Sequence, residues 1–117
     1  MPVRRARPAV TSKTLAGGCL QLVGFAQARI AHLQLGDHML ELFEYVAPRG
    51  PAIPATRTQA DQGFNHIGFR TDDTRGDYAR LKAQGVEFLS APVEFRPGVW
   101  IVYFRGPDGE VCELRQT

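Results

Sequence analysis

Hydrophobic and polar positions alternate along several short stretches of this chain, which is the pattern of half-buried β-strands. Residues 29–35 and 39–45 follow it on either side of Gly36-Asp37-His38, whose backbones suit a tight turn, so a β-hairpin is predicted. The pattern also permits a strand at 19–25. Residues 1–18 show no period and are interrupted by prolines and glycines, so an irregular arm is expected there.

The second half of the chain predicts a strand, a helix and three further strands. Strands are expected at 64–70, 86–89, 99–105 and 110–115, with a loop at 92–98. The helix is predicted to begin at Asp72-Asp73-Thr74, because these residues can cap it and place negative charge near its positive end. It is predicted to end at about Gln84, before Gly85. Gly106-Pro107-Asp108-Gly109 is a strong turn signal. Residues 47–63, rich in proline, predict an extended linker.

The two halves of the chain end alike, in a turn containing Asp and Gly followed by a strand with Glu-Leu at its centre. Glu41 and Glu113 occupy equivalent places, at an offset of 113 − 41 = 72 residues. The counterpart of His66 would then lie at 66 − 72 = −6, before Met1. We therefore expect the first half to be an incomplete copy of the second, without its first strand and most of its helix.

Composition places the chain among soluble globular proteins. Its 117 residues suit one domain, and 44% hydrophobic with 22% charged residues is an ordinary balance. No apolar run reaches the ~18 residues that a membrane span needs, and no secretory signal is evident. Two cysteines make no disulfide framework, so a reduced, cytoplasmic protein is expected.

Charge is distributed unevenly along the chain. Residues 1–36 carry five basic side chains and no acid, whereas the rest carries 9 basic and 12 acidic side chains, which gives the net charge of +5 − 3 = +2. The basic arm lacks interleaved aromatic residues and any nucleic-acid motif, so a solvated arm is favoured over a nucleic-acid partner.

Three ionisable side chains interrupt otherwise apolar strands: Glu41, His66 and Glu113. Glu41 shares its predicted face with Met39 and Phe43, and a carboxylate buried there requires a partner, a metal or a raised pKa. We predict that the three side chains meet at one site. One imidazole and two carboxylates suit Mn²⁺, Fe²⁺, Co²⁺, Ni²⁺ or Zn²⁺.

Structural roles are the alternatives for each of these side chains. His66 could be a hydrogen-bonded core histidine, and Glu113 could form a salt bridge with Arg105 or Arg115. Glu41 could pair with Arg29 across the hairpin.

Several stretches are similar to those of one family. They are Leu35-Gly36-Asp37-His38-Met39-Leu40-Glu41-Leu42-Phe43-Glu44, Asn65-His66-Ile67-Gly68-Phe69, Asp72-Asp73, Tyr78-Ala79-Arg80-Leu81-Lys82-Ala83-Gln84-Gly85-Val86, Tyr103-Phe104-Arg105-Gly106-Pro107-Asp108-Gly109 and Glu113-Leu114. Over about residues 28–117 the chain resembles the vicinal oxygen chelate superfamily, which includes glyoxalase I, methylmalonyl-CoA epimerase, extradiol dioxygenases and bleomycin-resistance proteins.

The resemblance implies an α+β fold in which two βαβββ modules form a curved mixed sheet, with helix on its outer face, around a divalent metal. Residues 19–46 would be a partial first module and 64–117 a complete second one. Glu41, His66 and Glu113 would be metal ligands. The fourth family ligand, on the first strand of the first module, has no counterpart in this chain.

The resemblance also implies an activity. A bound metal would polarise adjacent oxygens of a small substrate, and Glu113 or Glu41 would act as general base in a glyoxalase- or epimerase-like lyase or isomerase. The alternative is a metal-free pocket that binds small molecules, as in the bleomycin-resistance branch. An open sheet edge in the incomplete module also predicts a homodimer that completes the sheet or the site. Neither the substrate nor the metal is identified by these residues.

Overall fold

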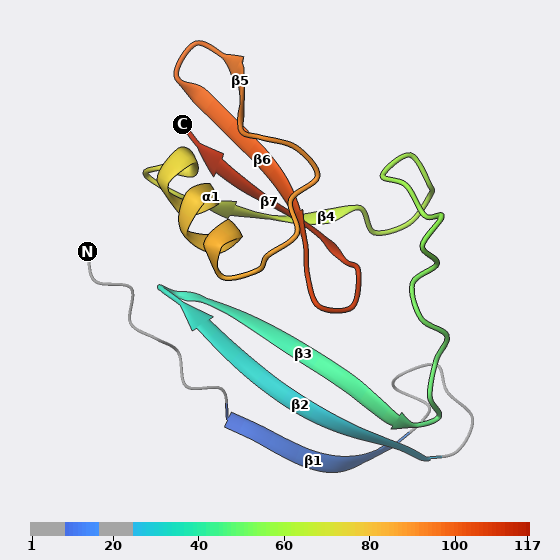
Figure 1. The fold of residues 1–117 in the computed structure, drawn as a ribbon. Coiled ribbons are helices and arrows are strands. Elements are labelled where there is room, and N and C mark those ends of the chain that lie inside the picture. The colour runs from blue at the N-terminus through green and yellow to red at the C-terminus, as the bar shows by residue number, and fades with distance from the viewer. Residues whose placement is uncertain (1–8, 17–24) are drawn as a thin grey trace. The chain divides into compact units, whose positions relative to one another are not determined.

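The structure of the protein, a computed structural model, describes residues 9–16 and 25–117. The chain forms two compact units, unit 1 (Met1–Pro51) and unit 2 (Ala52–Thr117), and each described sheet belongs to one of them (Figure 1). Within the described residues, no helix is long and apolar enough to cross a membrane.

Unit 1 is an antiparallel sheet whose described strands are β1 (Ala9–Ala16), β2 (Phe25–Leu35) and β3 (His38–Ala47), in the order β1-β2-β3. Strands β2 and β3 form the predicted hairpin, with Leu35 opposite His38. Gly36 in the turn has a φ of 58°, a left-handed conformation that glycine adopts without steric cost. The hairpin prediction is therefore confirmed.

The expectation of an irregular arm over residues 1–18 is wrong for residues 9–16. Strand β1 pairs along β2 from Ala9 opposite His32 to Ala16 opposite Phe25. Val10 and two threonines favour extended backbone, and the hydrogen bonds to β2 supply the order that the unperiodic sequence did not indicate. Residues 1–8 and 17–24 lie outside the described residues, and with them most of the strand permitted at 19–25.

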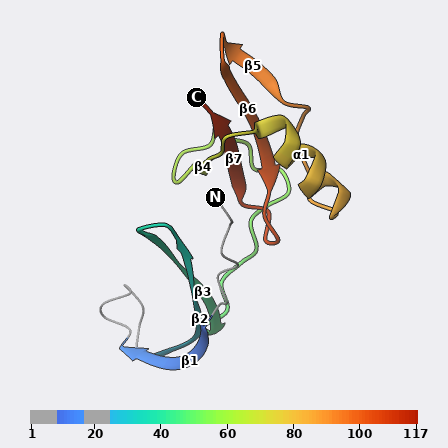
Figure 2. The ribbon, with the colours of Figure 1, turned by 90° about the vertical axis from the view of Figure 1, so that its left-hand side faces the viewer.

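Unit 2 contains the complete βαβββ module. Its elements are β4 (His66–Arg70), α1 (Thr74–Ala83), β5 (Val93–Arg96), β6 (Val99–Arg105) and β7 (Val111–Gln116). The strand order is β4-β7-β6-β5, in which β4 and β7 run parallel and the other neighbours run antiparallel. Helix α1 lies on one side of this sheet in both views (Figures 1 and 2). The α+β class and the module are confirmed.

Two local predictions in unit 2 need correction. Residues 86–89 form no strand, although one bridge joins Phe88 to Phe104 and the N–H of Leu89 donates to the carbonyl of Tyr103. Residues 93–96, expected in a loop, form β5, because Val93 and Glu94 pair with β6. The flanking prolines obscured this short strand in the sequence, whereas the neighbouring strand β6 stabilises it.

The helix is held against one face of the sheet by its first turn and by aromatic contacts. Asp73 caps it by accepting a hydrogen bond from the N–H of Gly76 at 2.9 Å. Fully buried Thr74 donates from its N–H to Gln116 and from its hydroxyl to the carbonyl of Trp100. The Arg75 guanidinium lies 4.4 Å from the centre of the Trp100 ring.

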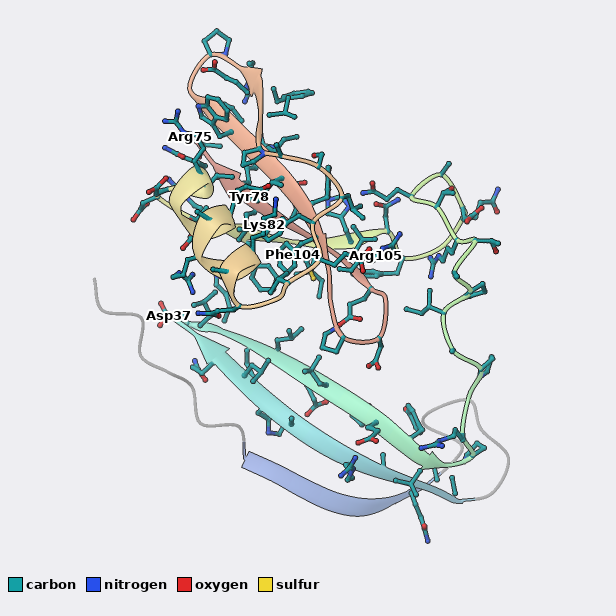
Figure 3. All side chains as sticks on the ribbon, viewed as in Figure 1. Asp37, Arg75, Tyr78, Lys82, Phe104 and Arg105 are labelled. Carbon is teal, nitrogen blue, oxygen red and sulfur yellow. The ribbon has the colours of Figure 1, made fainter. Side chains whose placement is uncertain are left out.

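Figure 3 shows Arg75, Tyr78 and Lys82 on α1, with Phe104 and Arg105 at the end of β6. The rings of Tyr78 and Phe88 meet edge to face at 4.7 Å, and Phe88 also contacts Phe104. Alternate residues of β6 and β7 thus face the helix, and the residues between them face the opposite side of the sheet. Strands β4 and β5 are the edges of this sheet in the described part of the chain. The expected homodimer stays a prediction.

Asp77 links α1 to Thr71, the residue after β4, and the stability that this link contributes depends on pH. The Thr71 hydroxyl donates to Oδ2 of Asp77 and Arg80 donates to Oδ1, and these contacts, Thr71 first, hold the pKa of Asp77 below its ordinary value. A lowered folded-state pKa stabilises the fold above the unfolded-state pKa, and this contribution is lost as pH falls through the folded-state value. Thr71→Val should therefore lower the free energy of unfolding by about 0.5–1 kcal/mol near neutral pH.

The difference between Thr71→Val and wild type should shrink below about pH 4, as urea unfolding at neutral and acid pH would show. It should not vanish there, because the Thr71 hydroxyl also accepts a hydrogen bond from the N–H of Asp73 at 3.1 Å. Thr56→Val is the matched control, because Thr56 is exposed in the 48–65 segment, and it should leave stability unchanged at both pH values. An equal loss for Thr71→Val at neutral and acid pH would contradict the role assigned to Asp77.

Candidate metal and substrate site

Two of the three predicted site residues meet on the face of unit 2 that lies opposite α1. His66 begins β4, and Glu113 lies in the adjacent strand β7. Nε2 of His66 is 3.1 Å from Oε2 of Glu113. The Glu113 residue is only 7% exposed, and the side chain of His66 is 28% exposed. The sheet thus holds an imidazole and a nearly buried carboxylate together.

The second nitrogen of His66 is held by a residue that the sequence analysis did not single out. Nδ1 lies 2.6 Å from Oδ1 of Asn65, and the amide group of Asn65 donates to the backbone carbonyl of Gln59. Since that bond orients the amide nitrogen of Asn65 toward Gln59, its oxygen faces the ring, and Nδ1 of His66 is the donor. The only feature of the sequence that could have indicated this role is the position of Asn65, an amide side chain directly before His66.

Both nitrogens of His66 therefore face oxygen acceptors. A neutral imidazole has a single N–H, so donation to Asn65 leaves the lone pair of Nε2 directed at the carboxylate of Glu113. Two lone pairs at this distance are compatible only with a proton or a cation between them. This arrangement suits a divalent metal bound by one nitrogen and one oxygen, the mixed donor set that Mn²⁺, Fe²⁺, Co²⁺, Ni²⁺ and Zn²⁺ accept.

Tyr103 and Arg115 complete the surroundings of Glu113. Tyr103 is opposite Glu113 in the β6–β7 register, and its ring meets that of His66 edge to face at 5.1 Å. Burial raises the pKa of the Tyr103 hydroxyl, and the hydrogen bond and negative charge of Glu113 raise it further. Nη1 of Arg115 lies 3.9 Å from Oε1 of Glu113. The salt bridge considered with Arg115 is present, whereas Arg105 pairs with Glu87 instead.

Glu41 lies in unit 1, and its partner there is His32. Nε2 of His32 and Oε2 of Glu41 are 2.5 Å apart, and the two side chains are 43% and 44% exposed. The expectation that Glu41 is enclosed among apolar neighbours is therefore wrong. The alternative pair with Arg29 is also wrong, because the β2–β3 register places Arg29 opposite Glu44 and His32 opposite Glu41.

Each unit thus contains one His–Glu pair, and the pair in unit 2 is the more buried. Within the described residues, neither unit by itself gathers three or more potential ligands of the His, Cys, Asp or Glu type. Cys112 lies beside Glu113 in sequence, but it is buried on the helix side, and burial raises the pKa of its thiol. It is the packed thiol that strand alternation predicts.

The βαβββ module and its strand order define a class of protein, and comparison with known families names it. Residues 8–114 match the model of the Glyoxalase/Bleomycin resistance protein/Dioxygenase superfamily. The chain belongs to this superfamily, which confirms the resemblance. No protein of curated function matches the chain.

Solved structures show the same fold at low sequence identity. A glyoxalase family protein from Bacillus cereus has a TM-score of 0.75 and 21% identity, over 92% of this chain and 76% of its own. One from Enterococcus faecalis has a TM-score of 0.61 and 23% identity, over 92% and 79%. The fosfomycin resistance protein FosX from Mesorhizobium loti has a TM-score of 0.51 and 21% identity, over 79% and 71%.

Proposed function

We propose that this chain is a divalent-metal-dependent lyase or isomerase that acts on a small oxygen-rich substrate, with His66 and Glu113 as metal ligands. The observation that carries the proposal is the pair itself. Asn65 holds Nδ1 of His66, and this leaves Nε2 directed at a nearly buried carboxylate 3.1 Å away. Membership of the superfamily supports the choice of reaction class.

The chain's own residues suit proton transfer beside a polarised oxygen. When bound, a divalent metal supplies Lewis acidity, which makes a proton next to a substrate carbonyl easier to remove. Glu113 is the proposed general base, because it is a shielded carboxylate. Burial and the neighbouring Glu113 raise the pKa of Tyr103, so its hydroxyl keeps its proton, donates to Glu113 and helps to hold that carboxylate in place. Glu41 stays a prediction, as a further ligand or an alternative base.

Elemental analysis of the natively purified protein tests the metal requirement. We expect about one equivalent of Mn, Fe, Co, Ni or Zn per chain, removable by a chelator and restored by adding back the metal. A content below roughly one tenth of an equivalent, together with no saturable uptake after chelation, would contradict the proposal.

A metal-free binding protein of the bleomycin-resistance type is the second candidate. The observation that favours it is the large exposed apolar side chains of unit 2: Phe64 at 69%, Phe95 at 66% and Val93 at 53% exposure. The same purified protein separates the two candidates. A hydrophobic ligand that raises the melting temperature of chelator-treated protein, equally in wild type and in His66→Ala, would favour the binding protein.

A further inference from the structure

A cavity in unit 2, at the residues that precede β4, is lined by two arginines. It measures about 80 Å³, and its wall includes Arg57, Arg105, Thr58 and Asn65. The cavity also reaches Val111, which is opposite His66 in the β4–β7 register. Asn65 lines the cavity and also holds Nδ1 of His66, so this residue links the cavity to the imidazole.

The guanidinium of Arg57 has N–H groups that remain available to a ligand. Its Nη2 donates to the backbone carbonyl of Phe64 at 2.7 Å, which anchors the guanidinium without neutralising it. In the described part of the chain, no carboxylate lies within salt-bridge distance of Arg57, as the six ion pairs there involve other residues. Arg57 is also partly buried, so its charge is less screened than that of a surface arginine.

Arg105 is the second cation. It is 33% exposed, its Nη1 lies 3.4 Å from the carbonyl of Gly109, and its Nε is 3.5 Å from Glu87, whose side chain is 71% exposed. That long and solvent-screened pair neutralises Arg105 only weakly.

One acid also lines the cavity. Oε2 of Glu110 accepts a hydrogen bond from the N–H of Asp108 at 2.9 Å, which occupies this oxygen within the turn before β7. The lining charge is therefore 2 − 1 = +1, from Arg57, Arg105 and Glu110. The Thr58 hydroxyl accepts from the N–H of Ala60 and keeps its own proton to donate.

We propose that this cavity binds a small oxyanion, a phosphate, phosphonate or carboxylate group, between Arg57 and Arg105. Guanidinium forks match such groups in geometry and charge, and charge-assisted hydrogen bonds are the strong ones. A cavity of about 80 Å³ accommodates a few water molecules or one tetrahedral oxyanion. This inference rests on the proposed function. The substrate is then a small molecule that places an anionic group in this cavity and further oxygens near His66 and Glu113.

The test uses the full-length protein with a chelator present, so that its outcome does not depend on metal binding. Inorganic phosphate is titrated while the ¹H–¹⁵N NMR signals of Thr58, Gly109 and Val111 are followed. We expect saturable shifts at these amides, with the affinity weakened about tenfold in Arg57→Gln and again in Arg105→Gln. Arg57→Lys, which keeps the charge but loses the fork, should lie between wild type and Arg57→Gln.

Arg80→Gln is the matched control, since Arg80 is an exposed arginine that pairs with Asp77 on α1 and does not line the cavity. It should bind phosphate as wild type does. Methylphosphonate and acetate titrations show which oxyanion is preferred. Shifts that do not saturate, or that persist unchanged in Arg57→Gln and Arg105→Gln variants whose other signals are native, would overturn the proposal. Metal binding without phosphate binding would reject the oxyanion proposal and leave the proposed metal site standing. Phosphate binding without metal binding would reject the metal site and leave the oxyanion proposal standing.

Discussion

Replacing His66 and Glu113 together by alanine is expected to weaken the binding of Mn²⁺, Co²⁺, Ni²⁺ or Zn²⁺ by at least about 100-fold. These two side chains supply the proposed metal-binding atoms of unit 2, Nε2 of His66 and Oε2 of Glu113, which lie 3.1 Å apart. In characterised metal sites, removing a residue that only supports a ligand already lowers metal affinity about 10–100-fold, so removing both ligands should lower it more. Isothermal titration calorimetry on chelator-treated protein measures the effect directly. Equal affinity in wild type and the double variant would remove the basis of the proposed function.

The second His–Glu pair of the chain provides the matched control. His32 and Glu41 in unit 1 make a similar contact, but both side chains are more than 40% exposed. If the buried pair alone binds metal, the His32→Ala, Glu41→Ala variant should bind as wild type does. If Glu41 completes the ligand set, as the family resemblance implies, Glu41→Ala should weaken binding and His32→Ala should not. The two single variants therefore decide the role of Glu41.

Asn65→Leu is expected to weaken metal binding by about 10–100-fold, although Asn65 is not itself a proposed ligand. Oδ1 of Asn65 accepts the proton of Nδ1, and the carbonyl of Gln59 orients that amide. Leucine is of similar size but has no acceptor, so the proton of a neutral ring is free to move to Nε2, the atom proposed to bind metal. Asn65 is thus a positioning residue.

Nuclear magnetic resonance distinguishes this effect from a general loss of structure. Long-range ¹H–¹⁵N correlations of metal-free wild type should show a proton on Nδ1 of His66, and those of Asn65→Leu should show the ring proton on Nε2 alone. Asn65→Asp keeps an acceptor and should restore the wild-type pattern. Gln59→Ala removes only a side chain, because the bond to Asn65 uses the backbone carbonyl, so it should change little. An unchanged tautomer in Asn65→Leu would contradict the role.

Local signals in the sequence were sufficient for most of unit 2. Asp73 caps α1, and Gly85 follows it with a φ of 90°, as the capping and stop residues predicted. Strand β6 occupies the predicted residues 99–105, because its alternation is long and regular. These features depend on the backbone preferences of each residue and on its near neighbours in sequence, so they can be predicted from the sequence.

Strands β1 and β5 could not be predicted in the same way. Both are stabilised by backbone hydrogen bonds to a longer neighbour, β2 and β6 respectively, and their own residues carry weak or proline-flanked patterns. The predicted strand at 86–89 shows the converse case, since suitable residues formed only one bridge to Phe104. Strand formation is a property of pairs of segments, and one segment's composition does not specify its partner.

For the candidate site, the sequence by itself determined which side chains were chemically suited to it. Strand alternation separated Glu113 from its buried neighbours Cys112 and Leu114, and His66 from Ile67. Only the tertiary structure decided that β4 lies directly beside β7, which brings His66 within 3.1 Å of Glu113 across 47 residues of chain. It also decided that Glu41 faces His32. Alternation assigns a side chain to a face of its strand, whereas register and strand order, set by packing of the whole sheet, assign its partner.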